Sequence, residues 1–166
     1  MNKNWCIGIF AAAIALVAPV LPAKADPIYV RYKSAAQTIS TTGWSNVTMD
    51  AASGSYYVTL NLTSSRRVVG RFTAESDCYG SSGYCPVRIV YQKVGSSTIS
   101  EFSPVVGTDF AFDTKDTPNT WQSHAISRSV VLPAGSYYVY VQGAVTNSGL
   151  TLRLDDAQLE VELYSP

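Results

Sequence analysis

The sequence has 166 residues, with 12 basic side chains, 12 acidic side chains and one histidine, so its formal net charge is zero. Nucleic-acid-binding proteins normally carry a basic excess gathered in a stripe or patch, and neither is present here. We therefore expect no nucleic-acid partner.

Residues 1–25 have the pattern of a cleaved signal peptide. A lysine precedes a short apolar run, and Ala23 and Ala25 supply small residues at the two positions that signal peptidase reads. The run contains a proline and is shorter than the ~20 residues needed to span a bilayer, so a membrane anchor is the weaker interpretation. We predict a secreted or periplasmic protein, formed by residues 26–166 as a single domain, with no membrane span after cleavage.

Beyond the signal peptide, apolar and polar residues alternate with a period of two, which is typical of β-strands. Residues 35–46 are interpreted as a loop that packs Trp44 onto the core. Gly70, inside a strand, indicates a bulge or a close backbone approach. Strands are predicted at residues 28–34, 47–49, 55–63, 67–75, 87–94, 98–103, 123–132, 136–146 and 150–164.

Short turns predict three hairpins, which join 55–63 to 67–75, 87–94 to 98–103, and 123–132 to 136–146. In the last strand, the apolar residues change parity across residues 155–157. A straight strand cannot place both apolar sets on one face, so a bulge is predicted there.

Cys78 and Cys85 flank a Gly/Ser loop between two apolar runs. In an exported protein such a pair predicts a disulfide. Because the enclosed loop is short, its contribution to stability is expected to be about 2–3 kcal/mol at most. We interpret residues 77–85 as a stiffened loop at the rim of a hairpin made by residues 67–75 and 87–94.

The number of strands and the lack of a helical period predict an all-β fold, an antiparallel β-sandwich with one disulfide. The even strand spacing favours a jelly roll over an immunoglobulin-like sandwich, whose Cys…Trp…Cys pattern is missing.

No catalytic motif stands out. His124, the only histidine, is interpreted as an ordinary strand residue, because the Gly-Ser-Ser-Gly segment at 80–83 lacks the Gly-x-Ser-x-Gly spacing of a nucleophile elbow. Loop carboxylates would permit a small glycoside hydrolase, which is the lesser alternative. The carboxylates considered are Glu75, Asp77, Glu101, Asp109 and Asp113.

Aromatic residues suggest binding rather than chemistry. Tyr79 and Tyr84 lie in or beside the disulfide loop, and Tyr138 and Tyr140, with Tyr57, lie opposite an apolar row of their strand. The candidate ligand-binding residues are Tyr79, Tyr84, Tyr138, Tyr140 and Trp121, because sugars stack on flat rings. No cofactor is predicted except a structural calcium at Asp155 or Asp156, since carboxylates are calcium ligands.

Four segments, 71–91, 107–113, 128–145 and 152–162, resemble in this order small secreted bacterial β-sandwich proteins of an uncharacterised family. The segment around Leu132-Pro133-Ala134-Gly135 is similar to tumour-necrosis-factor-like jelly rolls. The ending Leu-Arg-Leu-Asp-Asp resembles the last strand of carbohydrate-binding jelly rolls, where an aspartate often ligates calcium. This resemblance implies the same role for Asp155 or Asp156.

Together these features predict an exported, non-catalytic binding module, with carbohydrate favoured as the ligand. The alternative is a surface or assembly protein, such as an adhesin-like or envelope subunit, that works as an oligomer through protein contacts. The tyrosine content and the lack of a catalytic set favour the first of these.

Overall fold

The computed structural model describes residues 28–49, 55–106, 110–116 and 118–166. The predicted signal peptide lies outside these ranges. Within them the chain forms twelve β-strands and no helix, so the described residues offer no helix able to cross a membrane.

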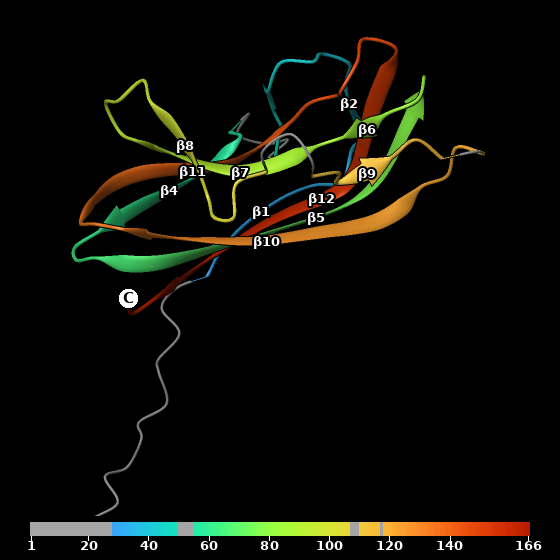
Figure 1. Cartoon of the computed structure of the whole chain (residues 1–166). Helices are drawn as coiled ribbons and strands as arrows, with labels where there is room; N and C mark the ends of the chain where they lie inside the picture. The colour runs from blue at the N-terminus through green and yellow to red at the C-terminus, as the bar shows by residue number, and fades with distance from the viewer. Residues whose placement is uncertain (1–27, 50–54, 107–109, 117) are drawn as a thin grey trace, which may run out of the picture.

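Two antiparallel sheets form the two layers seen edge-on in Figure 1. The first sheet has the order β1 (Tyr29–Lys33), β12 (Leu150–Tyr164), β5 (Arg66–Gly80) and β10 (Gln122–Leu132), and β2 (Gln37–Ile39) also pairs with β12. The second has β3 (Ser45–Asn46) and β4 (Tyr57–Leu62) beside β11 (Gly135–Gly143), followed by β7 (Val87–Lys93) and β8 (Ile99–Glu101). A small third sheet pairs β6 (Tyr84–Cys85) with β9 (Asp113–Thr114).

This arrangement confirms the predicted antiparallel all-β sandwich, and its strand order is consistent with a jelly roll. One side of the sandwich is closed by two backbone hydrogen bonds between Ser103 and Ser129, which join the segment after β8 to β10. Consecutive long strands mostly lie in opposite sheets. The loops between the sheets therefore gather at the ends of the sandwich, where ligand sites are usually built.

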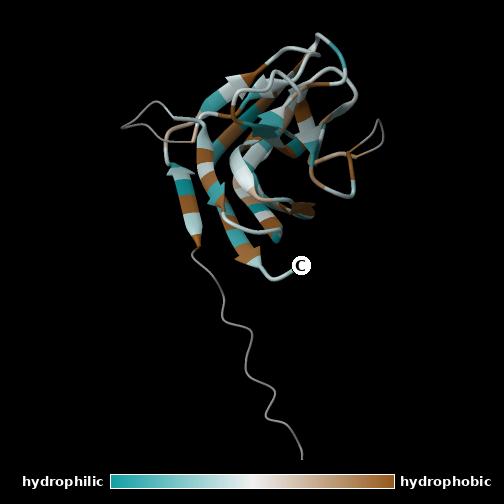
Figure 2. Ribbon diagram, turned by 90° about the vertical axis from the view of Figure 1, so that its left-hand side faces the viewer, coloured by the Kyte–Doolittle hydropathy of each residue, from teal (hydrophilic) through white to brown (hydrophobic). Residues whose placement is uncertain are grey.

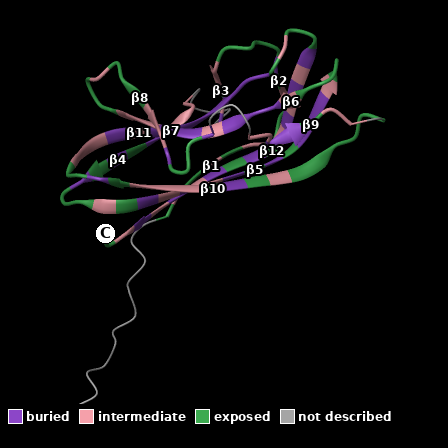
Figure 3. Cartoon of the chain, viewed as in Figure 1, coloured by how far each residue is buried: buried purple, intermediate pink, exposed green. Residues whose placement is uncertain are grey.

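The core lies between the sheets and follows the sequence alternation. Apolar and polar residues alternate along the strands in Figure 2, and buried residues recur along the strands of both layers in Figure 3. Phe72 and Phe102 are among the largest fully buried side chains. In β12 the register shifts between Asp155 and Gln158, which confirms the predicted bulge. The shift allows Leu154 and Leu159, of opposite parity, both to be buried.

Three of the four predicted hairpins are wrong. β4 pairs with β11 rather than with β5, and β10 pairs with β5 rather than with β11. The strands flanking the cysteine loop, β5 and β7, also belong to opposite sheets. Only the β7–β8 hairpin is confirmed. The turns themselves form where expected. Except for the turn between β7 and β8, however, each carries the chain from one sheet to the other.

Gly70 is a point of close approach between the sheets, as its place inside a strand predicted. A methyl group added there would lie 3.0 Å from Ile89 Cγ2 and 3.5 Å from Phe102 Cε2. We expect Gly70→Ala to lower the free energy of unfolding by about 1–2 kcal/mol through overpacking. Urea unfolding measures this, with Gly43→Ala as control, because a methyl group there meets only Thr41 Oγ1, at 3.6 Å. Equal stability of the two variants would contradict a tight contact at Gly70.

Candidate functional site

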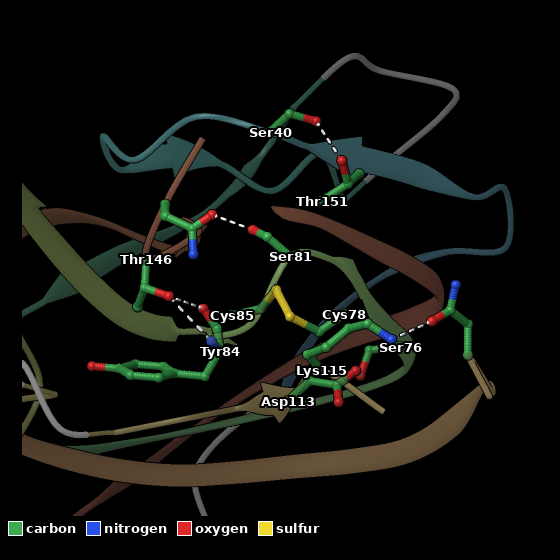
Figure 4. Close-up of a disulfide and its surroundings, with 12 residues drawn as sticks. Ser40, Ser76, Cys78, Ser81, Tyr84, Cys85, Asp113, Lys115, Thr146 and Thr151 are labelled. Atoms are coloured by element: carbon green, nitrogen blue, oxygen red, sulfur yellow. Dashed lines mark hydrogen bonds between the residues drawn. A yellow bond between two sulfur atoms is a disulfide. The ribbon is translucent and has the colours of Figure 1, made fainter. Parts of the chain in front are cut away.

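The disulfide confirms the predicted Cys78–Cys85 pair and lies at the corner where the chain passes from one sheet to the other. Its sulfurs are 2.04 Å apart, and both cysteines are buried. Figure 4 shows it beneath the loop that carries Ser81. The predicted rim loop is therefore correct only for residues 80–83, which are exposed. Asp77, Cys78 and Cys85 are part of the interior.

A pocket of about 230 Å³ lies beside this corner. Its position is set by backbone hydrogen bonds, from Ala144 N to Pro86 O at 3.0 Å and from Val145 N to Thr41 O at 3.1 Å. We call it the Trp44–Tyr84 pocket, after its two aromatic residues. It is lined by Thr42, Trp44, Tyr84, Pro86, Ala144, Val145 and Thr146.

Tyr84 is placed by its own backbone. The Thr146 hydroxyl accepts a hydrogen bond from Tyr84 N at 3.1 Å and donates one to Tyr84 O at 3.0 Å. Both bonds are visible in Figure 4. The next residue, Cys85, is covalently tied to β5. The Tyr84 main chain is thus fixed from two directions, which keeps the conformational entropy lost on ligand binding small.

Trp44 is placed by Arg88, whose guanidinium carbon lies 4.1 Å from the centre of the indole ring. Gln142 accepts hydrogen bonds from Arg88 Nε at 3.0 Å and Nη2 at 2.7 Å, and Glu101 forms an ion pair with Arg88 at 3.5 Å. Burial lowers the pKa of Arg88, and the Glu101 carboxylate opposes that shift. The predicted packing of Trp44 onto the core is wrong, because the ring instead lies against this half-buried cation.

The chemistry of the Trp44–Tyr84 pocket is that of a site for an uncharged ligand. Its lining combines two aromatic rings, apolar side chains and the threonines Thr42 and Thr146, and the described residues that line it include no Asp, Glu, Lys, Arg or His. Flat rings bind apolar C–H surfaces, and hydroxyl groups orient a polar ligand. Sequence reasoning singled out Tyr84 but missed Trp44 and Arg88 as site residues.

Tyr138 and Tyr140 lie on the outer face of the second sheet, opposite the buried Val139, as predicted. They differ in access. Tyr138 is half-buried, with its ring 4.4 Å from that of Tyr57, whereas Tyr140 is only 2% exposed and meets Tyr56 edge to face at 5.3 Å. Burial raises the pKa of the Tyr140 phenol. Tyr138 is therefore the more available of the two candidates.

Tyr79 and Trp121 are brought together, but around a protein cation. The Arg153 guanidinium carbon lies 4.7 Å from the Tyr79 ring centre and 4.8 Å from that of Trp121. Arg153 also forms an ion pair with Asp77, a carboxylate that is 1% exposed. Both rings therefore contact the half-buried arginine of an ion pair whose carboxylate is buried, which gives them a role in stability.

His124 lies within a buried polar cluster. Its Nδ1 is 2.8 Å from Ser76 Oγ, which donates a hydrogen bond to Asp113 Oδ2 at 2.7 Å. Because the serine has one proton and gives it to Asp113, its oxygen accepts from His124 Nδ1–H. A hydrolytic triad needs the histidine between serine and aspartate, whereas here the serine is central and buried.

The calcium candidates Asp155 and Asp156 lie at the bulge of β12. Asp155 accepts a hydrogen bond from Asp156 N at 2.9 Å, and Asp156 adopts a left-handed φ of 44°. Asp156 also lines a pocket of about 370 Å³ with Glu75 and Ser123. Among the described residues, no group of three or more His, Cys, Asp or Glu side chains is arranged to hold a metal.

The carboxylates considered for hydrolysis have separate surroundings. Asp77 and Asp113 are buried and bond to Arg153 and Ser76, respectively. Glu101 pairs with Arg88. Asp109 lies outside the described residues.

No protein-family model and no curated protein matches the sequence. Among solved structures, the chain is similar to dimeric latent PorU from Porphyromonas gingivalis, with a TM-score of 0.48 and 12% sequence identity. The similarity covers 91% of this chain and 14% of that one.

Proposed function

We propose that this protein is an exported, non-catalytic module that binds neutral carbohydrate in the Trp44–Tyr84 pocket. The observation that carries the proposal is the combination of two rings and two threonines in a lining without charged side chains. Sugars present apolar C–H faces and hydroxyl groups, which match rings and polar groups, respectively. The disulfide is consistent with an extracellular or periplasmic location.

The fold adds little to this proposal, because sandwiches of this type host many unrelated functions. The supporting feature is preorganisation. Trp44 lies on a guanidinium that Gln142 and Glu101 hold, and the backbone of Tyr84 is tied by Thr146 and by the disulfide at Cys85. A site whose rings are already placed loses less entropy when it binds a ligand.

The proposal is tested by isothermal calorimetry on residues 26–166 with soluble neutral β-glucan, mannan, xylan and galactan and their oligosaccharides. We expect Trp44→Ala and Tyr84→Ala each to weaken binding about tenfold, because each removes about 1.4 kcal/mol of ring contact. Tyr32→Ala is the matched control, since Tyr32 is 71% exposed on the other sheet. Absence of binding by the folded wild-type protein would overturn the proposal.

A second candidate, an assembly protein acting through protein contacts, is favoured by the edge strand β1. Ile28, Val30 and Tyr32 form an exposed apolar row on the outer side of this strand. Exposed apolar edges are templates for pairing with another chain. Light scattering tests this candidate: a concentration-dependent oligomer that Val30→Lys dissociates would support it, and a monomer at all concentrations would exclude self-assembly.

A further inference from the structure

The outer face of the second sheet carries a further set of uncharged polar and aromatic side chains. Antiparallel pairing places directly opposite residues on the same side of a sheet. Thr59 is opposite Tyr138, Asn61 is opposite Ser136, and Gln92 is also opposite Tyr138. We call this set, with Tyr57, the tyrosine platform; its members are Tyr57, Thr59, Asn61, Gln92, Ser136 and Tyr138.

The tyrosine platform is partly ordered by its own contacts. The rings of Tyr57 and Tyr138 are 4.4 Å apart at an interplanar angle of 50°, and Ser136 Oγ donates a hydrogen bond to Asn61 Oδ1 at 2.8 Å. Thr59 and Asn61 are exposed, and the two rings are half-buried. Like the Trp44–Tyr84 pocket, this surface offers rings and hydroxyls, and it adds two amides; none of its six named members is charged.

The outer face of the sheet runs from the tyrosine platform toward the pocket, with the buried Tyr140 and Gln142 between them. Gln142 lies on it, four residues after Tyr138 along β11, and binds the Arg88 guanidinium that lies over the Trp44 ring. The charges of Arg88 and Glu101 offset each other in an ion pair. The distance along the chain from Tyr138 to Ala144, which lines the pocket, is six residues, or about 20 Å of extended strand. That distance is several times the width of one sugar ring.

We propose that the tyrosine platform is a second contact site for the same ligand, so that the protein recognises a neutral polysaccharide chain rather than a single sugar. This inference rests on the proposed function of the Trp44–Tyr84 pocket. Two weak contacts on one polymer act together, because the first one raises the effective concentration of the second. Neither contact alone then gives the full affinity.

The test compares ligands of increasing length drawn from the polysaccharide that the wild-type protein binds. Polymer is expected to bind about 10²-fold more tightly than a disaccharide, which reaches only the pocket. Tyr138→Ala should remove most of that gain and leave disaccharide affinity unchanged. Trp44→Ala should weaken binding of both ligands. Asn61→Ala is a milder variant of the platform, and Tyr32→Ala is the control for loss of an exposed tyrosine.

The outcomes separate the two proposals. Disaccharide binding that Trp44→Ala weakens, with no gain for polymer or no effect of Tyr138→Ala, would overturn the platform and leave the pocket standing. Absence of binding to every saccharide would overturn the proposed function and the platform with it. Melting temperatures of all variants within about 3 °C of wild type ensure that unfolding does not imitate a lost contact.

Discussion

Replacing Arg153 by alanine is expected to lower the free energy of unfolding by about 3 kcal/mol, because it leaves the Asp77 carboxylate buried without a counter-charge. Asp77 is 1% exposed, and Arg153 is its ion-pair partner. The substitution also removes the cation that Tyr79 and Trp121 both contact. Urea unfolding followed by fluorescence measures the loss, and the emission of Trp121 should report the changed surroundings.

A second arginine on the same sheet is the matched control. Arg71 pairs with Glu162 at 2.6 Å, but the Arg71 side chain is 43% exposed. Exposed pairs are worth under about 1 kcal/mol, so Arg71→Ala should have a small effect. The hydrogen bond from Arg71 lowers the pKa of Glu162, so this small contribution is present near neutral pH and is lost as the pH falls through that depressed pKa.

A double variant, Arg153→Ala with Asp77→Asn, separates the stability lost through the buried charge from the stability lost through packing. Removal of the buried carboxylate charge should restore more than half of the lost stability, since the penalty comes mainly from desolvation. If the double variant is no more stable than Arg153→Ala, the loss comes from the ring contacts of Tyr79 and Trp121 instead.

The long strands and the bulge were predictable from the sequence because both depend on local pattern. The predicted loop at residues 35–46 instead contains β2 and β3, and the strand predicted at residues 47–49 is not formed. Alternation within β4, β11 and β12 places each residue on an inner or outer side, and the change of parity across Asp155–Ala157 requires an extra residue. Pairing is different. A period of two describes a strand equally well in either sheet, and a Pro-Ala-Gly turn serves both a hairpin and a passage between sheets. The sheet order was therefore not predictable from turn chemistry.

The candidate site was predictable only in part, for a similar reason. Tyr84 was found because the disulfide marks its loop, but the contact of Trp44 with Arg88 joins segments far apart in sequence. Tyr140 was expected on an open face, since alternation assumes that the side opposite the core is solvent. Here Tyr56 covers it, so the residue is buried on the outer side of its sheet.

Removal of the disulfide, with Cys78→Ala and Cys85→Ala together, is expected to lower the free energy of unfolding by about 3–4 kcal/mol. The short loop accounts for about 2.5 kcal/mol of this in the chain-entropy account. The sequence suggests no more than that entropy term. The structure adds a packing contribution, because both cysteines are buried in the core, and loss of their sulfurs leaves unfilled space there. Calorimetry should show a melting temperature about 10 °C lower.

The same variant tests what the disulfide contributes to the Trp44–Tyr84 pocket. Below its melting temperature the sandwich should persist, since its two large sheets are held by the pairing of β5, β10 and β12 and of β4, β7 and β11. The Tyr84 main chain then keeps its hydrogen bonds to Thr146 and its pairing with β9 but loses its covalent tie to β5. Carbohydrate affinity should fall at a temperature where the variant is fully folded. Unchanged affinity there would show that Thr146 and the pairing of β6 with β9 suffice to place Tyr84, and that the disulfide serves stability without serving binding.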